Sequence, residues 1–309
     1  MLFIFKKRSS PFYRISFSLV FAIFFSIRLA AQNDIEKDWI FKNSKSLSEL
    51  WELDDTHHRG TFIITSYKPI YLSLAKFTTN TDKTPRSENS DNFVDQPIDS
   101  DPIEAKFQLS LKTKVFHDML WGKADLWIAF SQRAYWQIYN QKLSRPFREI
   151  NYEPEVILNF PVNYKLFGFE GKMLGAALIH ESNGQSDPIS RSWNRVSFHA
   201  GFERDQWQIM LKSWLRLPTS NDDNPQILNY IGRGEAAITY DLGRQRFSAI
   251  ARHSLRIGEN GRGSLQLNWA FPIIKNFSGH IQVFDGYGET LIDYNHRQTT
   301  FGLGVSLMN

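Results

Sequence analysis

Apolar and polar residues alternate along most of this chain, and that alternation constrains the fold more than any other feature. In residues 105–117 and 244–257 nearly every second side chain is apolar, while many of those between are Lys, Arg, Gln or Ser. A period of two places successive side chains on opposite faces of a strand. Each such strand therefore has one apolar and one strongly polar face, as expected where two different solvents meet.

Twelve segments carry this pattern. They are residues 60–75, 105–117, 121–137, 152–164, 168–182, 194–203, 205–217, 226–240, 244–257, 261–273, 276–287 and 297–307. The number is even, and several segments are long enough to cross a bilayer at a tilt. We therefore predict an all-β fold, a twelve-stranded antiparallel transmembrane β-barrel over residues 60–309.

The connections favour the same fold. Long polar segments, at 76–104, 138–151, 183–193, 218–225 and 288–296, alternate with turns of a few residues. The connection at 258–261 is a short exception among the long ones. Long loops at one end and tight turns at the other are typical of outer-membrane barrels, whose long loops are extracellular.

A soluble β-sandwich, or two lipocalin-like barrels, would also give alternating strands, but with the apolar face inside. The polar face here includes Arg233, Glu235, Arg246, Arg252 and Arg256. Charges of both signs suit a narrow, hydrogen-bonded lumen better than an apolar ligand cavity.

Residues 1–31 have the pattern of an export signal, although a membrane anchor is the alternative. A basic start precedes the mostly apolar residues 15–27, and Leu29-Ala30-Ala31 provides small residues for cleavage. This segment holds five basic and no acidic residues, so 36 minus 5 leaves 31 Lys and Arg against 32 Asp and Glu. The remaining chain is nearly neutral and gives no reason to expect nucleic-acid binding. The chain has no cysteine, which excludes disulfides and thiolate chemistry.

Residues 32–59 show no clear period and are predicted to form an N-terminal periplasmic segment. They include the adjacent histidines His57 and His58. Neighbouring side chains on a strand point in opposite directions, so a solvated loop is favoured over a metal site there.

Residues for ester hydrolysis lie at the end of the 168–182 strand. His180 and Ser182 share one face of that strand, and Asn194 begins the next one. The shared face is the apolar face, which in a membrane barrel points to lipid. Ser182 would attack an ester carbonyl, His180 would take its proton, and Asn194 would orient the imidazole.

A neutral asparagine adds no charge to stabilise imidazolium, so a nearby cation is expected. Residues 185–190 are rich in hard oxygen ligands, which suits Ca²⁺. On another strand, Gln132 interrupts the lipid-facing run of residues 124–136. A buried amide in hydrocarbon needs a partner, so Gln132 lies either near the interface or in a contact with a second barrel.

The stretch His180-Glu-Ser-Asn-Gly-Gln-Ser-Asp-Pro-Ile-Ser-Arg-Ser-Trp-Asn-Arg195 resembles the outer membrane phospholipase A family of Gram-negative bacteria. Residues 146–154 and 286–295 support the resemblance, which extends from about Gly60 to near the end of the chain. It implies an outer-membrane enzyme that is active as a reversible, Ca²⁺-loaded homodimer. The implied activity is removal of acyl chains from phospholipids and lysophospholipids at both sn-1 and sn-2 positions, with the active site at the outer leaflet.

The resemblance also implies individual roles. Ser182, His180 and Asn194 match the catalytic triad, and the Gly184 amide matches the oxyanion position. The matching Ca²⁺ ligands are Ser190, the Gln185 carbonyl, Asp187 at a second position, and Ser144 from the partner barrel; Gln132 matches the dimer contact.

The sequence departs from the family pattern at three places. Glu181 stands where aspartate is expected, Gln185 replaces an arginine, and the chain ends in Leu307-Met-Asn309 without a terminal aromatic residue. Two other functions compete with the hydrolase. One is a non-catalytic outer-membrane barrel, acting as a narrow channel or structural protein, and the other is a soluble lipid-binding β protein.

Overall fold

The computed structural model describes residues 45–274 and 277–307. These belong to the second of two structural units, Lys42–Asn309. The predicted signal segment, residues 1–31, and residues 32–44 of the predicted periplasmic segment lie outside the described residues.

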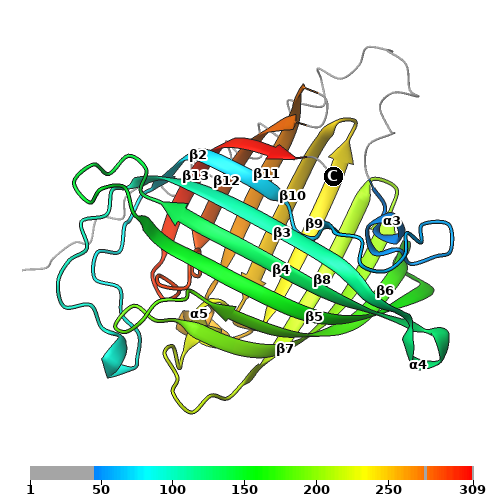
Figure 1. Ribbon diagram of the computed structural model, residues 1–309, viewed down its shortest axis with the longest axis horizontal. Helices are drawn as coiled ribbons and strands as arrows, with labels where there is room; N and C mark the ends of the chain where they lie inside the picture. The colour runs from blue at the N-terminus through cyan, green and yellow to red at the C-terminus, as the bar shows by residue number, and fades with distance from the viewer. Residues whose placement is uncertain (1–44, 275–276, 308–309) are drawn as a thin grey trace, which may run out of the picture. The chain divides into compact units, whose positions relative to one another are not determined.

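Antiparallel strands form one sheet that closes on itself (Figure 1). The strands are β1 (Thr65–Ser66), β2 (Ile70–Thr78), β3 (Ile103–Asp118), β4 (Ala124–Trp136), β5 (Phe147–Leu166), β6 (Phe169–Ser182), β7 (Ser192–Arg204), β8 (Trp207–Leu217), β9 (Gly234–Leu242), β10 (Gln245–His253), β11 (Gly263–Ile274), β12 (Phe277–Gly286) and β13 (Gln298–Leu307). β1 and β2 both lie along β3 and together act as one interrupted strand, and β3 also pairs with β4 to complete the ring. The predicted twelve-stranded antiparallel barrel is therefore confirmed.

Burial shows which face of each strand is apolar. The outward side chains of Leu109 and Leu303 are 40% and 59% exposed, whereas Lys106 and Lys114 inside the barrel are 2% and 0% exposed. A water-soluble sandwich or lipocalin-like barrel requires the reverse arrangement. The apolar outer wall and polar interior are those of a barrel surrounded by lipid.

The lumen is filled by paired charges, as the sequence predicted. Arg252 Nε donates to Glu235 Oε2 over 2.7 Å, and Lys106 Nζ donates to Glu289 Oε1 over 2.9 Å. Within the described part of the barrel, these pairs satisfy charges that would be costly to bury alone.

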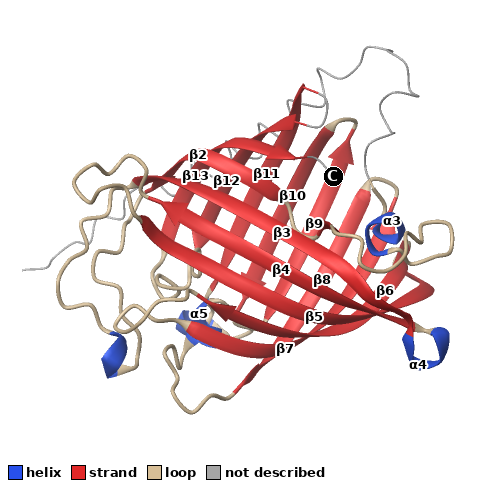
Figure 2. Cartoon of the chain, viewed as in Figure 1, coloured by secondary structure: helices blue, strands red, loops and turns tan. Residues whose placement is uncertain are grey.

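The long loops lie at one end of the barrel and the tight turns at the other, as Figure 2 shows by its tan segments. The long-loop end is formed by residues 79–102, 137–146, 183–191, 218–233, 254–262 and 287–297. The predicted exception at 258–261 is wrong: β10 ends at His253, and residues 254–262 form a loop containing η4 (Gly258–Asn260). The loop 79–102 contains a second short 3-10 turn, η3 (Ser90–Asn92). The turn between β3 and β4 at the other end includes α4 (Met119–Gly122).

Three further predicted strand boundaries are wrong. The first predicted strand, 60–75, is replaced by β1 and by β2, which continues to Thr78. β5 begins at Phe147 instead of residue 152, and the segment predicted as a strand from 226 starts with a helix, α5 (Ile227–Tyr230). Ile227 and Ile231 are buried against Trp193 and Trp214 beneath the long loops. Burial in this small cluster, rather than in lipid, explains the apolar residues that suggested a strand. None of the helices among the described residues has the length and apolar character needed to span a membrane.

The N-terminal segment enters the barrel at the tight-turn end. Helix α3 (Leu47–Trp51) begins at Ser46, whose hydroxyl accepts a hydrogen bond from the Glu49 amide. Trp51 is buried with Trp127, and the Lys112 ammonium lies 3.3 Å from the centre of the Trp51 ring. The predicted aperiodic segment thus contains a short helix that fills this end of the lumen.

Candidate functional site

The register of β6 and β7 brings the predicted base and its orienter together. His180 lies directly opposite Asn194 in this strand pair. His180 is exposed on the outer wall, and its Nδ1 lies 2.7 Å from Asn194 Oδ1. Because a carbonyl oxygen only accepts, Nδ1 carries the proton and Nε2 has the free lone pair.

Glu181, between the two catalytic candidates, points into the barrel and anchors the strand. Its carboxylate accepts hydrogen bonds from Arg133 (2.6 Å) and Arg195 (2.9 Å) and from the Trp193 indole (3.1 Å). Successive residues on a strand face opposite ways. Holding Glu181 inside therefore holds His180 and Ser182 on the outside.

The predicted nucleophile, Ser182, is the last residue of β6. It shares the outer face with His180, and two residues along a strand are about 6.7 Å apart at the backbone. The hydrogen bonds of the described residues do not include one between the Ser182 hydroxyl and His180. The strand pair thus has its base–orienter contact formed and its nucleophile on the same face.

Gly184 occupies a backbone conformation that favours glycine. Its φ is +63°, and a Cβ added there would lie 3.2 Å from the Tyr152 ring. Both the left-handed φ and the nearby ring favour glycine here. The turn carries the Gly184 amide two residues beyond Ser182, and in the described part of the chain this N–H donates to no protein acceptor.

The buried Asn183 side chain braces the loop that follows. Its Nδ2 donates to the Ile189 carbonyl over 2.7 Å, and its Oδ1 accepts from the Arg191 amide over 3.0 Å. These contacts tie the two ends of the loop 183–191 together. The predicted Ca²⁺ ligands Gln185, Asp187 and Ser190 lie within the loop that these contacts brace.

The predicted Ca²⁺ ligands lie in three places. Ser190 is partly buried and donates to Asp223 Oδ2 over 2.8 Å, so two hard oxygen ligands converge there. Gln185 and Asp187 are exposed on the same loop. Ser144 lies on the loop 137–146, and no hydrogen bond among the described residues joins it to the loop 183–191. The Ser190 hydroxyl and the Asp223 carboxylate are two oxygen donors of the kind that calcium binds.

Sequence reasoning missed two residues that structure this loop. Asp223 accepts from the hydroxyls of both Ser190 and Ser192. Asn92, which is 0% exposed, donates to Asp187 Oδ1 and to the Ser190 carbonyl from the distant loop 79–102. The adjacent acidic residues Asp222 and Asp223 in a long loop were a sequence signal that could have predicted the role of Asp223. The role of Asn92 depends on contact between two distant loops.

Burial also changes the charge environment around the loop. It lowers the pKa of the Arg191 guanidinium, which donates to the Pro188 and Ser190 carbonyls. Burial, together with a hydrogen bond to Glu88, raises the pKa of the Tyr294 hydroxyl. Tyr294 therefore stays neutral at physiological pH and acts as a hydrogen-bond donor to Glu88.

A shallow groove of about 360 Å³ runs along the outer wall beside His180 and Asn194. It is lined by Ile128, Pro154, Glu155, Val156, Leu178, Ile179, His180, Asn194, Arg195 and Leu217. Because Leu178 and Val156 are exposed apolar side chains, the groove suits a hydrocarbon chain.

Gln132, the predicted dimer contact, is half-buried on β4, where it lies opposite Leu109 and Tyr152.

A family model described as phospholipase A1 matches residues 47–307. Among individual relatives, a putative phospholipase A1 of Neisseria meningitidis is 38% identical over 266 residues, covering 84% of this chain and 69% of the relative. The phospholipase A1 of Escherichia coli is 39% identical over 204 residues, covering 66% of this chain and 69% of the relative.

Solved structures give the same match. Outer membrane phospholipase A from Escherichia coli has a TM-score of 0.71 at 34% identity, covering 81% of this chain and 93% of that one. The outer membrane phospholipase of Salmonella typhi, solved as a dimer with bound calcium, has a TM-score of 0.72 at 34% identity, covering 81% and 94%.

Proposed function

Since the chain belongs to the phospholipase A1 family, we propose that it is a calcium-dependent outer-membrane phospholipase with a Ser182–His180–Asn194 triad. It hydrolyses acyl esters at the sn-1 and sn-2 positions of phospholipids and lysophospholipids. The observation that carries this proposal is the His180–Asn194 hydrogen bond on the lipid-facing wall. A hydrolase built on that face meets lipid.

The reaction starts when the Ser182 hydroxyl oxygen attacks the ester carbonyl carbon. His180 Nε2 takes the hydroxyl proton while Asn194 Oδ1 holds Nδ1–H. The carbonyl oxygen becomes an oxyanion, which the Gly184 N–H stabilises. When the tetrahedral intermediate collapses, His180 returns the proton to the departing glycerol oxygen, leaving the acyl group on Ser182.

The second half of the reaction regenerates the enzyme. His180 Nε2 takes a proton from water, whose oxygen attacks the acyl carbonyl carbon. Collapse breaks the bond to the Ser182 oxygen, which regains its proton from His180, and the fatty acid leaves. The apolar groove beside His180 is suited to hold the acyl chain during both steps.

Calcium would be held by the Ser190 hydroxyl, the Gln185 carbonyl and the partner subunit's Ser144, with Asp187 at a second position. The Asp223 carboxylate beside Ser190 adds a negative charge to this set. When bound, calcium would supply positive charge near the developing oxyanion. Neutral Asn194 orients the imidazole but adds no charge that stabilises imidazolium. The need for Ser144 from a second chain makes the active form a reversible homodimer, with Gln132 in the contact.

We extend this proposal to the domain organisation of the whole chain. Residues 1–31 are a cleaved signal peptide, residues 32–59 a periplasmic segment, and residues 60–309 the barrel with its active site at the outer leaflet. The paired charges in the lumen favour this enzyme over an open channel.

Covalent labelling tests the proposed nucleophile. A fluorophosphonate probe should label the refolded protein once, on the peptide that contains Ser182, in the presence of Ca²⁺. Ser182→Ala should remove the label and Ser186→Ala, in the neighbouring loop, should leave it. Labelling that persists in Ser182→Ala would show that another residue is the nucleophile.

A further inference from the structure

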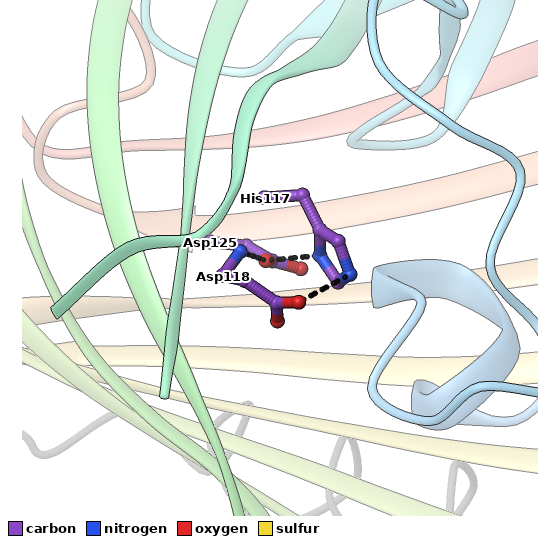
Figure 3. Close-up of side chains that lie close together, drawn as sticks. All are labelled: His117, Asp118 and Asp125. Carbon is purple, nitrogen blue, oxygen red and sulfur yellow. Dashed lines mark hydrogen bonds and ion pairs between the residues drawn. The ribbon is translucent and has the colours of Figure 1, made fainter. Parts of the chain in front are cut away.

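A second group of side chains able to bind a metal, His117, Asp118 and Asp125 (Figure 3), lies at the β3–β4 turn, which is at the tight-turn end of the barrel (Figure 1). His117 lies between two carboxylates: its Nδ1 is 2.8 Å from Asp125 Oδ1, and its Nε2 is 3.3 Å from Asp118 Oδ2. We propose that His117 Nε2 and the Asp118 carboxylate bind one divalent transition-metal ion, such as Zn²⁺, while Asp125 orients the imidazole.

Asp125 is fixed as a hydrogen-bond acceptor. One of its oxygens pairs with the Lys114 ammonium over 2.7 Å, and the other also accepts from the Asp118 amide over 3.2 Å. His117 Nδ1 therefore donates its proton to Asp125, which leaves Nε2, 3.3 Å from Asp118 Oδ2, as the metal-binding nitrogen. A carboxylate that holds one ring nitrogen while the other binds the ion is the usual support of a metal-binding histidine.

The distance between the two proposed ligands fits one ion. Zinc binds histidine nitrogen and carboxylate oxygen at about 2.0–2.1 Å in tetrahedral geometry. Two such ligands are then about 3.3–3.4 Å apart, which agrees with the 3.3 Å between His117 Nε2 and Asp118 Oδ2. Lys114 occupies the second oxygen of Asp125, so that residue suits the orienting role better than the ligand role.

His58, from a different part of the chain, packs against the His117 ring. Its ring lies 4.1 Å, centre to centre, from the His117 ring. The sequence favoured a solvated loop for the His57–His58 pair, but the structure separates them: His57 Nδ1 bonds to Asp54 over 2.7 Å, and His58 lies on His117. An ion at His117 would therefore lie where the N-terminal segment meets the β3–β4 turn.

The chemistry of the ligands selects the class of ion. Calcium prefers ligand sets made entirely of oxygen, whereas mixed imidazole and carboxylate sites suit zinc and neighbouring first-row metals. His117 and Asp118 are exposed, so water can complete the coordination. This site is independent of the proposed lipase activity, because the β3–β4 turn lies at the opposite end of the barrel from the long loops (Figure 1).

Calorimetry tests the proposal on untagged, full-length protein refolded in detergent. Excess Ca²⁺ fills oxygen-ligand sites, and Zn²⁺ is then titrated. We expect one Zn²⁺ per chain, loss of that binding in His117→Ala, and about tenfold to hundredfold weaker binding in Asp125→Asn. His57→Ala is the matched control and should bind as the unaltered protein does.

A second measurement keeps the result independent of folding defects. Co²⁺ bound at this site should give visible d–d absorption that Zn²⁺ displaces, while the shift in gel mobility on heating reports whether each variant is folded. Folded His117→Ala that binds Zn²⁺ with unchanged affinity, or unaltered protein that binds none, would overturn the proposal.

Discussion

Replacing Asn194 with alanine isolates the contact on which the proposed triad depends. The substitution removes the Oδ1 atom that lies 2.7 Å from His180 Nδ1, and leaves Ser182 and His180 in place. In the resting enzyme the lost contact is a hydrogen bond between neutral groups, which contributes about 0.5–1.5 kcal/mol net. In the transition state His180 is protonated on both nitrogens, and a hydrogen bond to a charged group contributes about 1.5–3 kcal/mol.

The difference between the two states predicts a moderate loss of activity. It amounts to about 1–1.5 kcal/mol, so kcat falls by roughly fivefold to thirteenfold. His180 is exposed, so water can replace the amide and keep the imidazole solvated. Ser182→Ala, which removes the nucleophile itself, should cost on the order of 10³-fold or more.

The assay is fatty-acid release from phospholipid micelles at saturating Ca²⁺, with kcat measured for both variants. Asn159→Ala is a matched control, because Asn159 pairs with His199 inside the barrel over 3.2 Å and should leave kcat unchanged. An Asn194→Ala loss as large as that of Ser182→Ala would show that asparagine does more than orient the ring. An unchanged kcat would show that the pair has no catalytic role.

Three further substitutions test separate parts of the account. Asp223→Asn should raise the Ca²⁺ concentration for half-maximal activity on the order of tenfold, because it removes negative charge beside Ser190. Asp91→Asn is the control, and an equal rise in that concentration in both variants would contradict the role of Asp223. Gln132→Ala should weaken dimerisation by roughly 0.6–1.7 kcal/mol in a cross-linking assay, whereas an equal loss in Leu303→Ala on another strand would deny Gln132 a specific contact. Trp51→Ala should lower the free energy of unfolding by about 3–5 kcal/mol in urea titrations, because it leaves a cavity inside the lumen. The kcat should be unchanged. A free energy of unfolding equal to that of the unaltered protein would mean that α3 does not support the barrel.

The strand pattern was predictable because lipid and the polar lumen act on alternate side chains. Leu109 and Lys106 show this directly, since the first is exposed to the outside and the second is buried in the lumen. The same rule predicts from sequence alone that His180 and Ser182 lie on the outer wall. It failed at residues 226–233, because Ile227 and Ile231 are buried by loops rather than by lipid, and periodicity cannot distinguish the two.

Contacts between distant loops could not be predicted. Asn92 reaches Asp187 from a loop 95 residues earlier in the chain, and no local pattern encodes that meeting. The separation of His57 from His58 is a similar case, because it depends on where the β3–β4 turn presents His117. Strand register thus fixed the triad candidates, while the surroundings of the loop 183–191 required the structure.

The most direct test of the central claim is fatty-acid release by the purified protein in detergent, measured with Ca²⁺ and with a chelator. The account predicts release from phospholipid and lysophospholipid in Ca²⁺, none in the chelator, and none in folded Ser182→Ala. Equal release by the unaltered protein and by Ser182→Ala would contradict it.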